Sequence, residues 1–284
     1  MNLQHFFDEA TNSFTYLISD PVSKQAAVID PVLDFDPAAV ATKTTSAEQL
    51  LSQIKQQDLQ LKWILETHVH ADHMSAAYWL KQQTGASIVI GYNVTQVQDT
   101  FNRLYALPQE QMATPNDFDR LVNDGDELEL GELVIKVLHT PGHTPSCCTY
   151  HIDGCAFVGD TIFMPDFGTS RCDFPGGDAA QLYQSIQKIY ALGDDTQLYM
   201  CHDYRPGGRE LKWKISVAEQ KQTNKHINQE VSEQDFVKMR TERDQQLSVP
   251  KLILPALQVN IKAGRLPLDP ESGTSFLRLP LNQF

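Results

Sequence analysis

Short apolar runs of strand length and longer amphipathic segments alternate along the first half of the chain. The runs SFTYLISD (13–20) and QAAVIDP (25–31) flank a short turn, so we expect a β-hairpin at the start of a sheet. Residues 46–60 repeat apolar positions at helical spacing, and Ser46 and Gln49 have the spacing of a capping box. This segment therefore predicts an amphipathic helix after the first hairpin.

The next segments continue the alternation of strand and helix. LKWILET (61–67) predicts a buried strand, and SIVIGY (87–92) predicts another. Between them, DHMSAAYWLKQQTG (72–85) predicts a helix that begins at an aspartate and ends at Gly85.

The second half of the chain begins as a β-region. From residue 124, apolar runs are separated by turns that contain Gly or Asp; these runs are DELEL, GELVIKVLHT, CTYHI and CAFVGDTIF. Residues 178–193 then predict a helix and residues 196–200 a strand. Groups of strands and helices in this order predict an α/β (α+β) protein, a sandwich of two sheets with helices on the outer faces.

The last part of the chain is more polar. It contains one clear helical segment at 232–246, followed by a tail punctuated by prolines at 250–284. We expect a catalytic domain at 1–210 and a C-terminal extension at 211–284 that packs on the same domain.

Composition is that of an ordinary globular protein. The 284 residues are 41% hydrophobic and 21% charged, and no apolar run approaches the roughly 20 residues of a membrane-spanning helix. The start MNLQHFFDEATNS has neither the basic region nor the apolar region of a secretory signal. We therefore expect a cytoplasmic protein with no membrane partner.

Charge and cysteine content narrow the partners further. The formal net charge is −13 and the basic residues are scattered apart from a group at 205–214, so the basic footprint of a nucleic-acid-binding protein is missing. The five cysteines have no C-x-x-C spacing, which favours reduced thiols over a disulfide framework. We expect no nucleic-acid partner and a reducing compartment.

Candidate metal ligands are concentrated in ILETHVHADHMSA (64–76). His68 and His70 follow a predicted strand two residues apart, so in an extended segment both side chains point the same way. Asp72 and His73 fall in the first turn of the predicted helix and are also our candidates for catalytic groups. Imidazole and carboxylate without thiolate suit zinc, iron or manganese. A single histidine is more often a solvated loop residue or a cap, but this density predicts a metal site.

Three further candidates follow later strands. They are His143 in HTPGHTPS, Asp160 in VGDTIF and His202 in MCHDY, each at a predicted junction of strand and loop, where a rigid scaffold presents side chains. Each alone has an ordinary interpretation as a turn residue or a buried polar residue. Together with the first group they complete a ligand set.

The order and spacing of these motifs closely resemble the metallo-β-lactamase superfamily. The resemblance covers residues from about 13 to about 210 and rests on four motifs: H-V-H-A-D-H, T-P-G-H, G-D and C-H. It implies an αββα sandwich with the metal site in a groove at one edge of the two sheets. Because this fold carries many chemistries, the fold alone does not give the reaction.

The resemblance implies two alternative metal centres. In the superfamily hydrolases all seven residues resemble ligands of a two-zinc centre, with Asp160 as the bridge and a metal-bound hydroxide as nucleophile. In the persulfide dioxygenases three side chains hold one Fe(II), and they correspond to His68, His143 and Asp160. The other four would then support these ligands: His70, Asp72, His73 and His202.

The segments beside the ligands favour the dioxygenase. GDTIFMPDFGTSRCDFPGG (159–177) resembles the persulfide dioxygenase segment in which an arginine, here Arg171, is followed two residues later by Asp-Phe. Glyoxalase II typically has an aromatic residue and Glu-Gly-Thr there, and G-H-E-Y where this chain has CHDY (201–204). Residues 205–284 further resemble a bacterial branch of β-lactamase-hydrolase-like proteins.

The function implied by the resemblance is oxidation of a glutathione-type persulfide by O2 to sulfite and thiol, with one Fe(II) per chain. A protein of charge −13 needs local positive groups to hold an anionic substrate, and we expect Arg171, Tyr204 and Arg205 to contact it. A salt bridge from Arg171 to Asp173 or Asp178 is the competing interpretation. The alternative function is a hydrolase of the glyoxalase II, lactonase or β-lactamase type with one or two Zn(II). The family often dimerises, so a homodimer is an alternative to a monomer.

Overall fold

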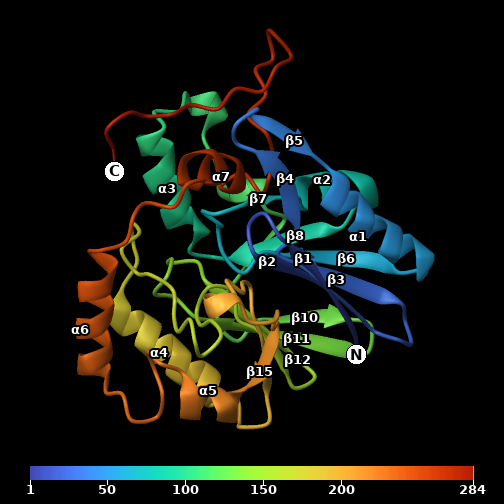
Figure 1. The fold of residues 1–284 in the computed structure, drawn as a ribbon. Helices are drawn as coiled ribbons and strands as arrows, with labels where there is room; N and C mark the ends of the chain where they lie inside the picture. The colour runs from blue at the N-terminus through green and yellow to red at the C-terminus, as the bar shows by residue number, and fades with distance from the viewer. Residues whose placement is uncertain (284) are drawn as a thin grey trace.

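The chain folds into two β-sheets stacked face to face, with helices on both outer sides (Figure 1). The computed structural model describes residues 1–283. A third, three-stranded sheet lies beside the first. No helix among residues 1–283 is long and apolar enough to cross a lipid bilayer.

Six strands form each main sheet. In spatial order the first sheet contains β1 (Asn2–Asp8), β2 (Ser13–Ser19), β3 (Gln25–Ile29), β6 (Gln60–Leu65), β8 (Ser87–Gly91) and β9 (Arg120–Val122). The second contains β10 (Glu127–Leu130), β11 (Leu133–His139), β12 (Cys148–Ile152), β13 (Cys155–Phe157), β14 (Gln197–Tyr199) and β15 (Lys214–Ser216). The small sheet contains β5 (Ala41–Lys43), β4 (Val32–Asp36) and β7 (Met74–Ser75).

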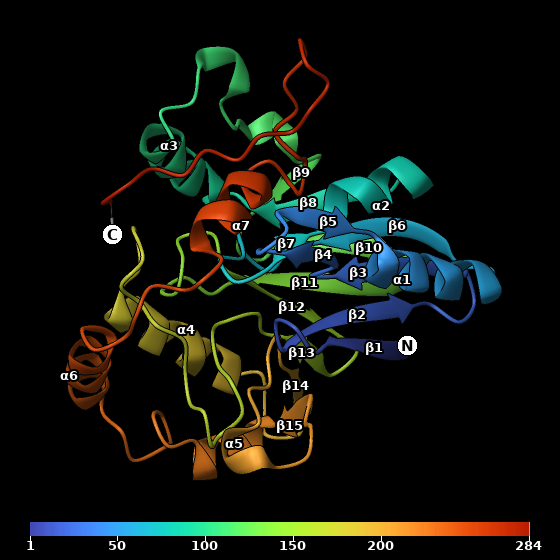
Figure 2. The same ribbon diagram turned by 45° about the horizontal axis from the view of Figure 1, so that its top comes forward.

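Seven α-helices cover the sheets within the described residues. They are α1 (Thr45–Gln56), α2 (Ala77–Thr84), α3 (Val94–Leu104), α4 (Ala179–Tyr190), α5 (Val217–Thr223), α6 (Glu233–Asp244) and α7 (Ile253–Asn260). Helices α1, α2, α3 and α7 lie on the side of the first sheet, and α4, α5 and α6 lie on the side of the second (Figure 2). Apolar side chains of each group of helices share a core with the sheet that they cover. A third core, which includes Phe14, Tyr150 and Phe157, fills the space between the sheets.

Alternation along the strands decides which face enters the central core. In β10 the two leucines, Leu128 and Leu130, are fully buried, whereas Glu127 and Glu129 face solvent. The predicted hairpin is confirmed, since β2 and β3 pair antiparallel. The predicted αββα sandwich is confirmed as well.

Two local predictions are wrong. The helix predicted from residue 72 begins only at Ala77, because Met74 and Ser75 pair with β4 as a short strand. Asp72 and His73 therefore lie in a loop and not in a helical turn. The capping box is also absent: Ser46 lies inside α1, and its N–H and hydroxyl donate to Asp34 at 3.0 and 2.6 Å.

Tertiary packing creates elements that the sequence pattern did not predict. Among these are β1, α3, α5 and α7, the last within the proline-punctuated tail. Ile253, Leu257 and Ile261 of the α7 region enter the core beside the first sheet. The second sheet continues past residue 210 into β15, and the division of the chain into 1–210 and 211–284 stays a prediction.

Candidate metal centre

The seven predicted ligands converge at one edge of the sandwich, in loops that follow four strands. The loop after β6 carries four of them and the loops after β11, β13 and β14 carry one each: His68, His70, Asp72 and His73, then His143, then Asp160, then His202. All are buried except Asp72, which is partly exposed. The prediction that distant loops meet at one place is therefore consistent with the structure, and the chemical roles stay predictions.

Three of these residues form a compact cluster. Nε2 of His68 and Nε2 of His143 each lie 3.8 Å from Oδ2 of Asp160. The ligand atoms of all three residues lie within 4.8 Å of one another. Two imidazoles and one carboxylate at such separations match the facial arrangement that leaves coordination positions open on an iron.

The other oxygen of Asp160 faces a second group. Oδ1 of Asp160 lies 3.3 Å from Nε2 of His202, and that nitrogen is 3.1 Å from Oδ2 of Asp72. Oδ1 of Asp72 lies 3.3 Å from Nδ1 of His73. Asp160 thus stands between the two halves of the centre, as a bridging ligand would.

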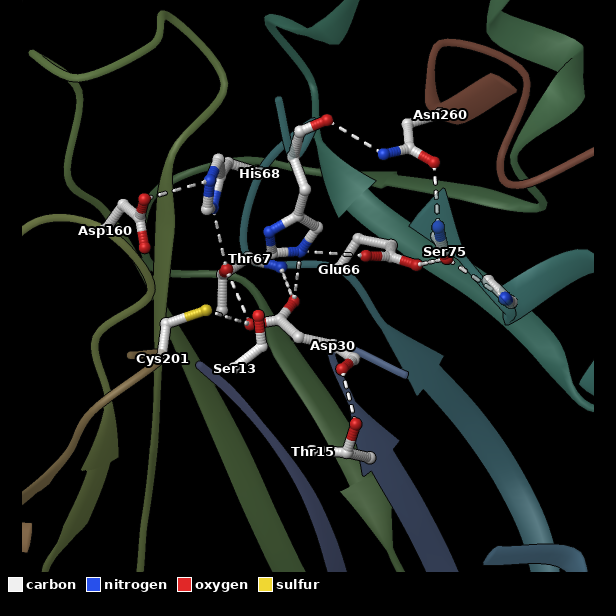
Figure 3. A network of polar contacts seen from close by, with 12 residues as sticks. Ser13, Thr15, Asp30, Glu66, Thr67, His68, Ser75, Asp160, Cys201 and Asn260 are labelled. Carbon is white, nitrogen blue, oxygen red and sulfur yellow. Dashed lines mark hydrogen bonds and ion pairs between the residues drawn. The ribbon is translucent and has the colours of Figure 1, made fainter. Parts of the chain in front are cut away.

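Hydrogen bonds select the tautomer of His68 and of His143, the two histidines of the compact cluster. Nδ1 of His143 is 2.8 Å from the carbonyl oxygen of Arg171, and a carbonyl only accepts, so Nδ1 carries the proton. Nδ1 of His68 is 3.0 Å from the hydroxyl of Thr67, which itself donates to Asp30 at 2.8 Å (Figure 3). In a neutral imidazole the proton on Nδ1 leaves Nε2 as the acceptor, and in both residues Nε2 is the nitrogen that faces Asp160.

The remaining histidines are held in the same way. Nε2 of His70 lies 3.1 Å from Asp30 and 3.2 Å from Glu66, whereas Nδ1 of His73 and Nδ1 of His202 approach the hydroxyl of Ser13 at 3.2 and 3.3 Å. Each ring thus has one nitrogen fixed by an outer partner. The opposite nitrogens of His70 and His73 are buried without a hydrogen bond, and Nε2 of His202 faces only the carboxylates of Asp72 and Asp160.

Such orphaned atoms are rare in proteins and call for a partner. Here they all belong to metal-ligating residue types whose other ring nitrogen is bound to a hydroxyl or a carboxylate, the arrangement usual around protein-bound metals. The donor set therefore fits a metal centre. In His70 the nitrogen without a hydrogen bond is Nδ1, whereas in His73 it is Nε2.

The charges in this pocket shift several pKa values in opposite directions. Burial lowers the pKa of His68 and of His73. Burial also opposes protonation of His202, but Asp72 and Asp160 outweigh it and raise its pKa to about 9. For His70 the carboxylates of Asp30 and Glu66 likewise overcome burial and raise the pKa well above its usual value. The protein thus holds protons at positions where a cation would bind.

Glycine is required at two of the ligand loops. Gly159 has φ +52°, and a Cβ there would lie 2.6 Å from the Thr67 hydroxyl oxygen, so any other residue would displace the loop of His68. Gly142 has φ +133°, and its Cβ would lie 2.4 Å from the backbone N of Leu182 in α4. The loops of Asp160 and His143 therefore approach their neighbours more closely than a side chain allows.

A pocket of about 220 Å³ opens beside the first cluster. Asp72, His143 and Asp160 lie in its wall, together with an aromatic group of Phe163, Phe167, Phe174 and Tyr204. Tyr204, which is 37% exposed, stacks on the ring of His202 with centroids 5.4 Å apart. A small, partly apolar pocket against a ligand cluster is the usual form of a substrate site.

Of the three predicted substrate contacts, Arg171 and Tyr204 line the pocket and Arg205 does not. Arg171 lines the pocket, but its guanidinium binds Asp173 at 2.6 and 2.7 Å and the carbonyl of Ser248 at 2.7 Å, which matches the salt-bridge interpretation. Arg205 does not line this pocket; it binds Glu9 at 2.6 Å and stacks over Phe7. The role of Arg205 as a substrate contact stays a prediction, and its pairing with Glu9 at the surface does not support it.

Sequence reasoning missed the arginines of α6. Arg240 and Arg243 both line the pocket, although Arg240 lies 38 residues after the last predicted ligand, His202. Arg240 is buried and donates to Asp244. Arg243 is exposed, and within residues 1–283 its side chain has no ion pair. The only signal in the sequence was their spacing of three residues, which places both side chains on the same face of a helix.

The thiols near the centre are unsuited to nucleophilic catalysis. Burial raises the pKa of Cys147 to about 12 and raises those of Cys172 and Cys201 as well. A thiol with a raised pKa stays protonated and unreactive at neutral pH. These raised pKa values give no support to a thiol nucleophile.

A family model described as the metallo-beta-lactamase superfamily matches residues 9–202. The chain belongs to this superfamily. A probable metallo-hydrolase of Burkholderia pseudomallei is 49% identical over 99% of both chains. A beta-lactamase hydrolase-like protein of Xylella fastidiosa is 49% identical over 98% of this chain, which spans 64% of that relative. Glyoxylase B2 of Dictyostelium discoideum is 44% identical over 94% of this chain and 92% of its own.

Relatives named for persulfide chemistry are more distant. The human mitochondrial persulfide dioxygenase ETHE1 is 30% identical over 92% of this chain and 88% of its own. The crystal structure of ETHE1 from Myxococcus xanthus superposes with a TM-score of 0.76 at 31% identity, over 93% of this chain and all of that one. The superfamily and its metal-dependent character are shared by both groups of relatives.

Proposed function

We propose that this metallo-β-lactamase-fold protein is a persulfide dioxygenase that uses one Fe(II) per chain. The observation that carries the proposal is the compact cluster of His68, His143 and Asp160, which is complete by itself and borders the pocket. Two imidazoles and one carboxylate are the ligand set of non-haem iron oxygenases. The similarity to ETHE1 over nearly the full chain supports the same function.

The reaction consumes one persulfide, one O2 and one water, and it yields one thiol, one sulfite and two protons. An Fe(II) ion held by three side chains supplies the one-electron chemistry that O2 needs in order to react. The protein's own part is to hold these side chains in fixed tautomers and to exclude water with the rings of Phe163, Phe167 and Tyr204. Asp72 and His73 remain our candidates for proton transfer beside the second half of the centre.

We propose Arg243 as the anchor for a carboxylate of a glutathione-type substrate. It lines the pocket and is free of an ion pair, whereas Arg171 and Arg240 are bound to carboxylates of the protein. A charged hydrogen bond to a carboxylate contributes about 1.5–3 kcal/mol. Arg171 in this proposal shapes the pocket wall through its bonds to Asp173 and Ser248.

A hydrolase with two metal ions is the second candidate. It is favoured by the names of the relatives with higher identity, and by the free nitrogens of His73 and His202 beside Asp160, which would serve a second ion. Two ions held by these residues would supply the acidity that activates water for hydrolysis, and a thioester of glutathione would be the natural substrate class.

Metal content and oxygen uptake distinguish the two candidates. The protein is purified without oxygen, its iron and zinc are measured, and glutathione persulfide or S-lactoylglutathione is added in an oxygen-electrode cell. One iron per chain with O2 uptake on the persulfide is the expected result. Two zinc ions with thioester hydrolysis, and no O2 uptake after iron loading, would refute the dioxygenase and support the hydrolase.

A further inference from the structure

The carboxamide of Asn260, the last residue of α7, lies against the loop that carries four predicted ligands (Figure 3). Its Nδ2 donates to the carbonyl oxygens of His70 and His73 at 2.8 and 2.7 Å. Its Oδ1 accepts the backbone N–H of Ser75 at 2.8 Å. Asn260 is 4% exposed, so water does not compete for these bonds.

Only one orientation of this amide satisfies all three contacts. A carbonyl oxygen accepts and a backbone N–H donates, so Nδ2 must face the two carbonyls and Oδ1 must face Ser75. Residues 66–73 have no regular secondary structure, and their backbone groups need partners from elsewhere. One side chain thus binds three backbone groups, those of His70, His73 and Ser75, in a stretch of six residues.

The contact extends to a ligand side chain. The hydroxyl of Ser75 donates to Glu66, and Glu66 lies 3.2 Å from Nε2 of His70. On the other side α7 is anchored by its apolar residues in the core and by Gln98, which donates to the carbonyl of Ile261 at 2.9 Å. A series of polar contacts therefore links α7 to the side chain of His70 through Ser75 and Glu66.

We propose that Asn260 is a positioning residue of the metal centre, through which the C-terminal helix sets the directions of His70, Asp72 and His73. The helix lies far from these residues in the sequence, about 190 positions away from His70, yet the contact is direct. Outer partners of metal ligands typically contribute 10–100-fold to metal affinity. We expect Asn260→Ala to weaken metal binding by that factor.

Gln258 provides a matched control on the same helix. It is equally buried, and its side chain bonds the backbone of Arg278 at 2.9 and 3.2 Å, away from the ligand loop. Gln258→Ala therefore removes buried hydrogen bonds from α7 without touching the loop. It should lower the thermal unfolding temperature of the metal-free protein but leave metal affinity within about twofold, a threshold well under the expected effect.

The test uses the full chain stripped of metal. Dissociation constants for Zn(II), and for Fe(II) without oxygen, are measured by competition with a chromophoric chelator, alongside thermal unfolding of the metal-free protein. The visible spectrum of the Co(II) form reports ligand geometry and should change in Asn260→Ala but not in Gln258→Ala. Parental affinity and spectrum in Asn260→Ala, or equal weakening in both variants, would overturn the proposal.

An isosteric variant covers the case in which Asn260→Ala does not fold. Asn260→Asp retains an acceptor for Ser75 but turns a carboxylate oxygen toward the carbonyls of His70 and His73. The added negative charge alone would favour a cation, so weaker binding in this variant indicates lost positioning. Unchanged or tighter binding would contradict it. The inference rests on the metal centre and not on the persulfide reaction, so the two fail separately.

Discussion

Asp30 accepts hydrogen bonds from residues of the metal centre, and the effect of Asp30→Asn on metal affinity can be calculated. The carboxylate is 3% exposed and accepts the N–H and hydroxyl of Thr67 at 2.7 and 2.8 Å and Nε2 of His70 at 3.1 Å. Through Thr67 it also fixes His68. Asp30→Asn keeps the shape but removes the charge and one acceptor, so two histidines lose their fixed tautomer.

The expected loss is 10–100-fold in metal affinity, because outer partners of metal ligands have this typical effect. That range corresponds to about 1.4–2.8 kcal/mol at 1.4 kcal/mol for each tenfold. The pKa of His70 should also fall, since Asp30 is one of the two carboxylates that raise it. Competition with a chelator measures the affinity, and NMR titration of the metal-free protein follows His70.

Asp20→Asn is the matched control for this prediction. Asp20 is a buried carboxylate that accepts backbone N–H groups of Ser23 and Glu132 beyond the far end of β2. Ser13, at the other end of that strand, touches the metal centre, and the six intervening residues span roughly 20 Å. The control should lose stability and keep its metal. Metal affinity of Asp30→Asn within twofold of the parent would refute the supporting role.

Three further outcomes are expected. His143→Ala and Asp160→Ala should each reduce bound metal to below about a tenth of the parental content. Each variant removes a ligand of a three-residue cluster, which lowers metal affinity more than the loss of an outer partner does. Near-normal iron by elemental analysis would contradict the ligand assignment. Arg243→Ala should raise KM for glutathione persulfide about tenfold, equivalent to one charged hydrogen bond, with kcat and iron content unchanged; an unchanged KM would exclude the anchor. The pKa values of His202, raised to about 9, and of His70 favour their protonated forms at pH 7 in the metal-free protein, so a second ion held by these rings would displace protons and its affinity should rise as the pH rises toward 9. Calorimetric heats of binding a second ion that do not depend on the buffer's ionisation enthalpy would contradict this.

The local pattern of apolar and polar residues was sufficient to predict the sandwich and the candidate ligands. Alternating leucines in β10 and the apolar runs of β2 and β3 specify buried faces from a few adjacent residues, because a strand places every second side chain on one side. Likewise, H-V-H-A-D-H concentrates ligand types so strongly that a metal site was predictable before any contact was known.

Long-range contacts decided what surrounds the ligands. The start of α2 moved to Ala77 because Met74 and Ser75 pair with β4, about 40 residues earlier in the chain. Arg205 is held at the surface by Glu9, 196 positions away in the chain, and Arg243 reaches the pocket through the packing of α6. Asn260 looks like any polar helix residue until the fold brings it to His70 and His73.

The sequence by itself determined which atoms are available to bind a metal, since ligand chemistry belongs to each side chain. Tertiary structure alone decided which nitrogen of each imidazole is free and how the charges balance. Those properties depend on hydrogen-bond partners and distances between segments that the linear order does not contain.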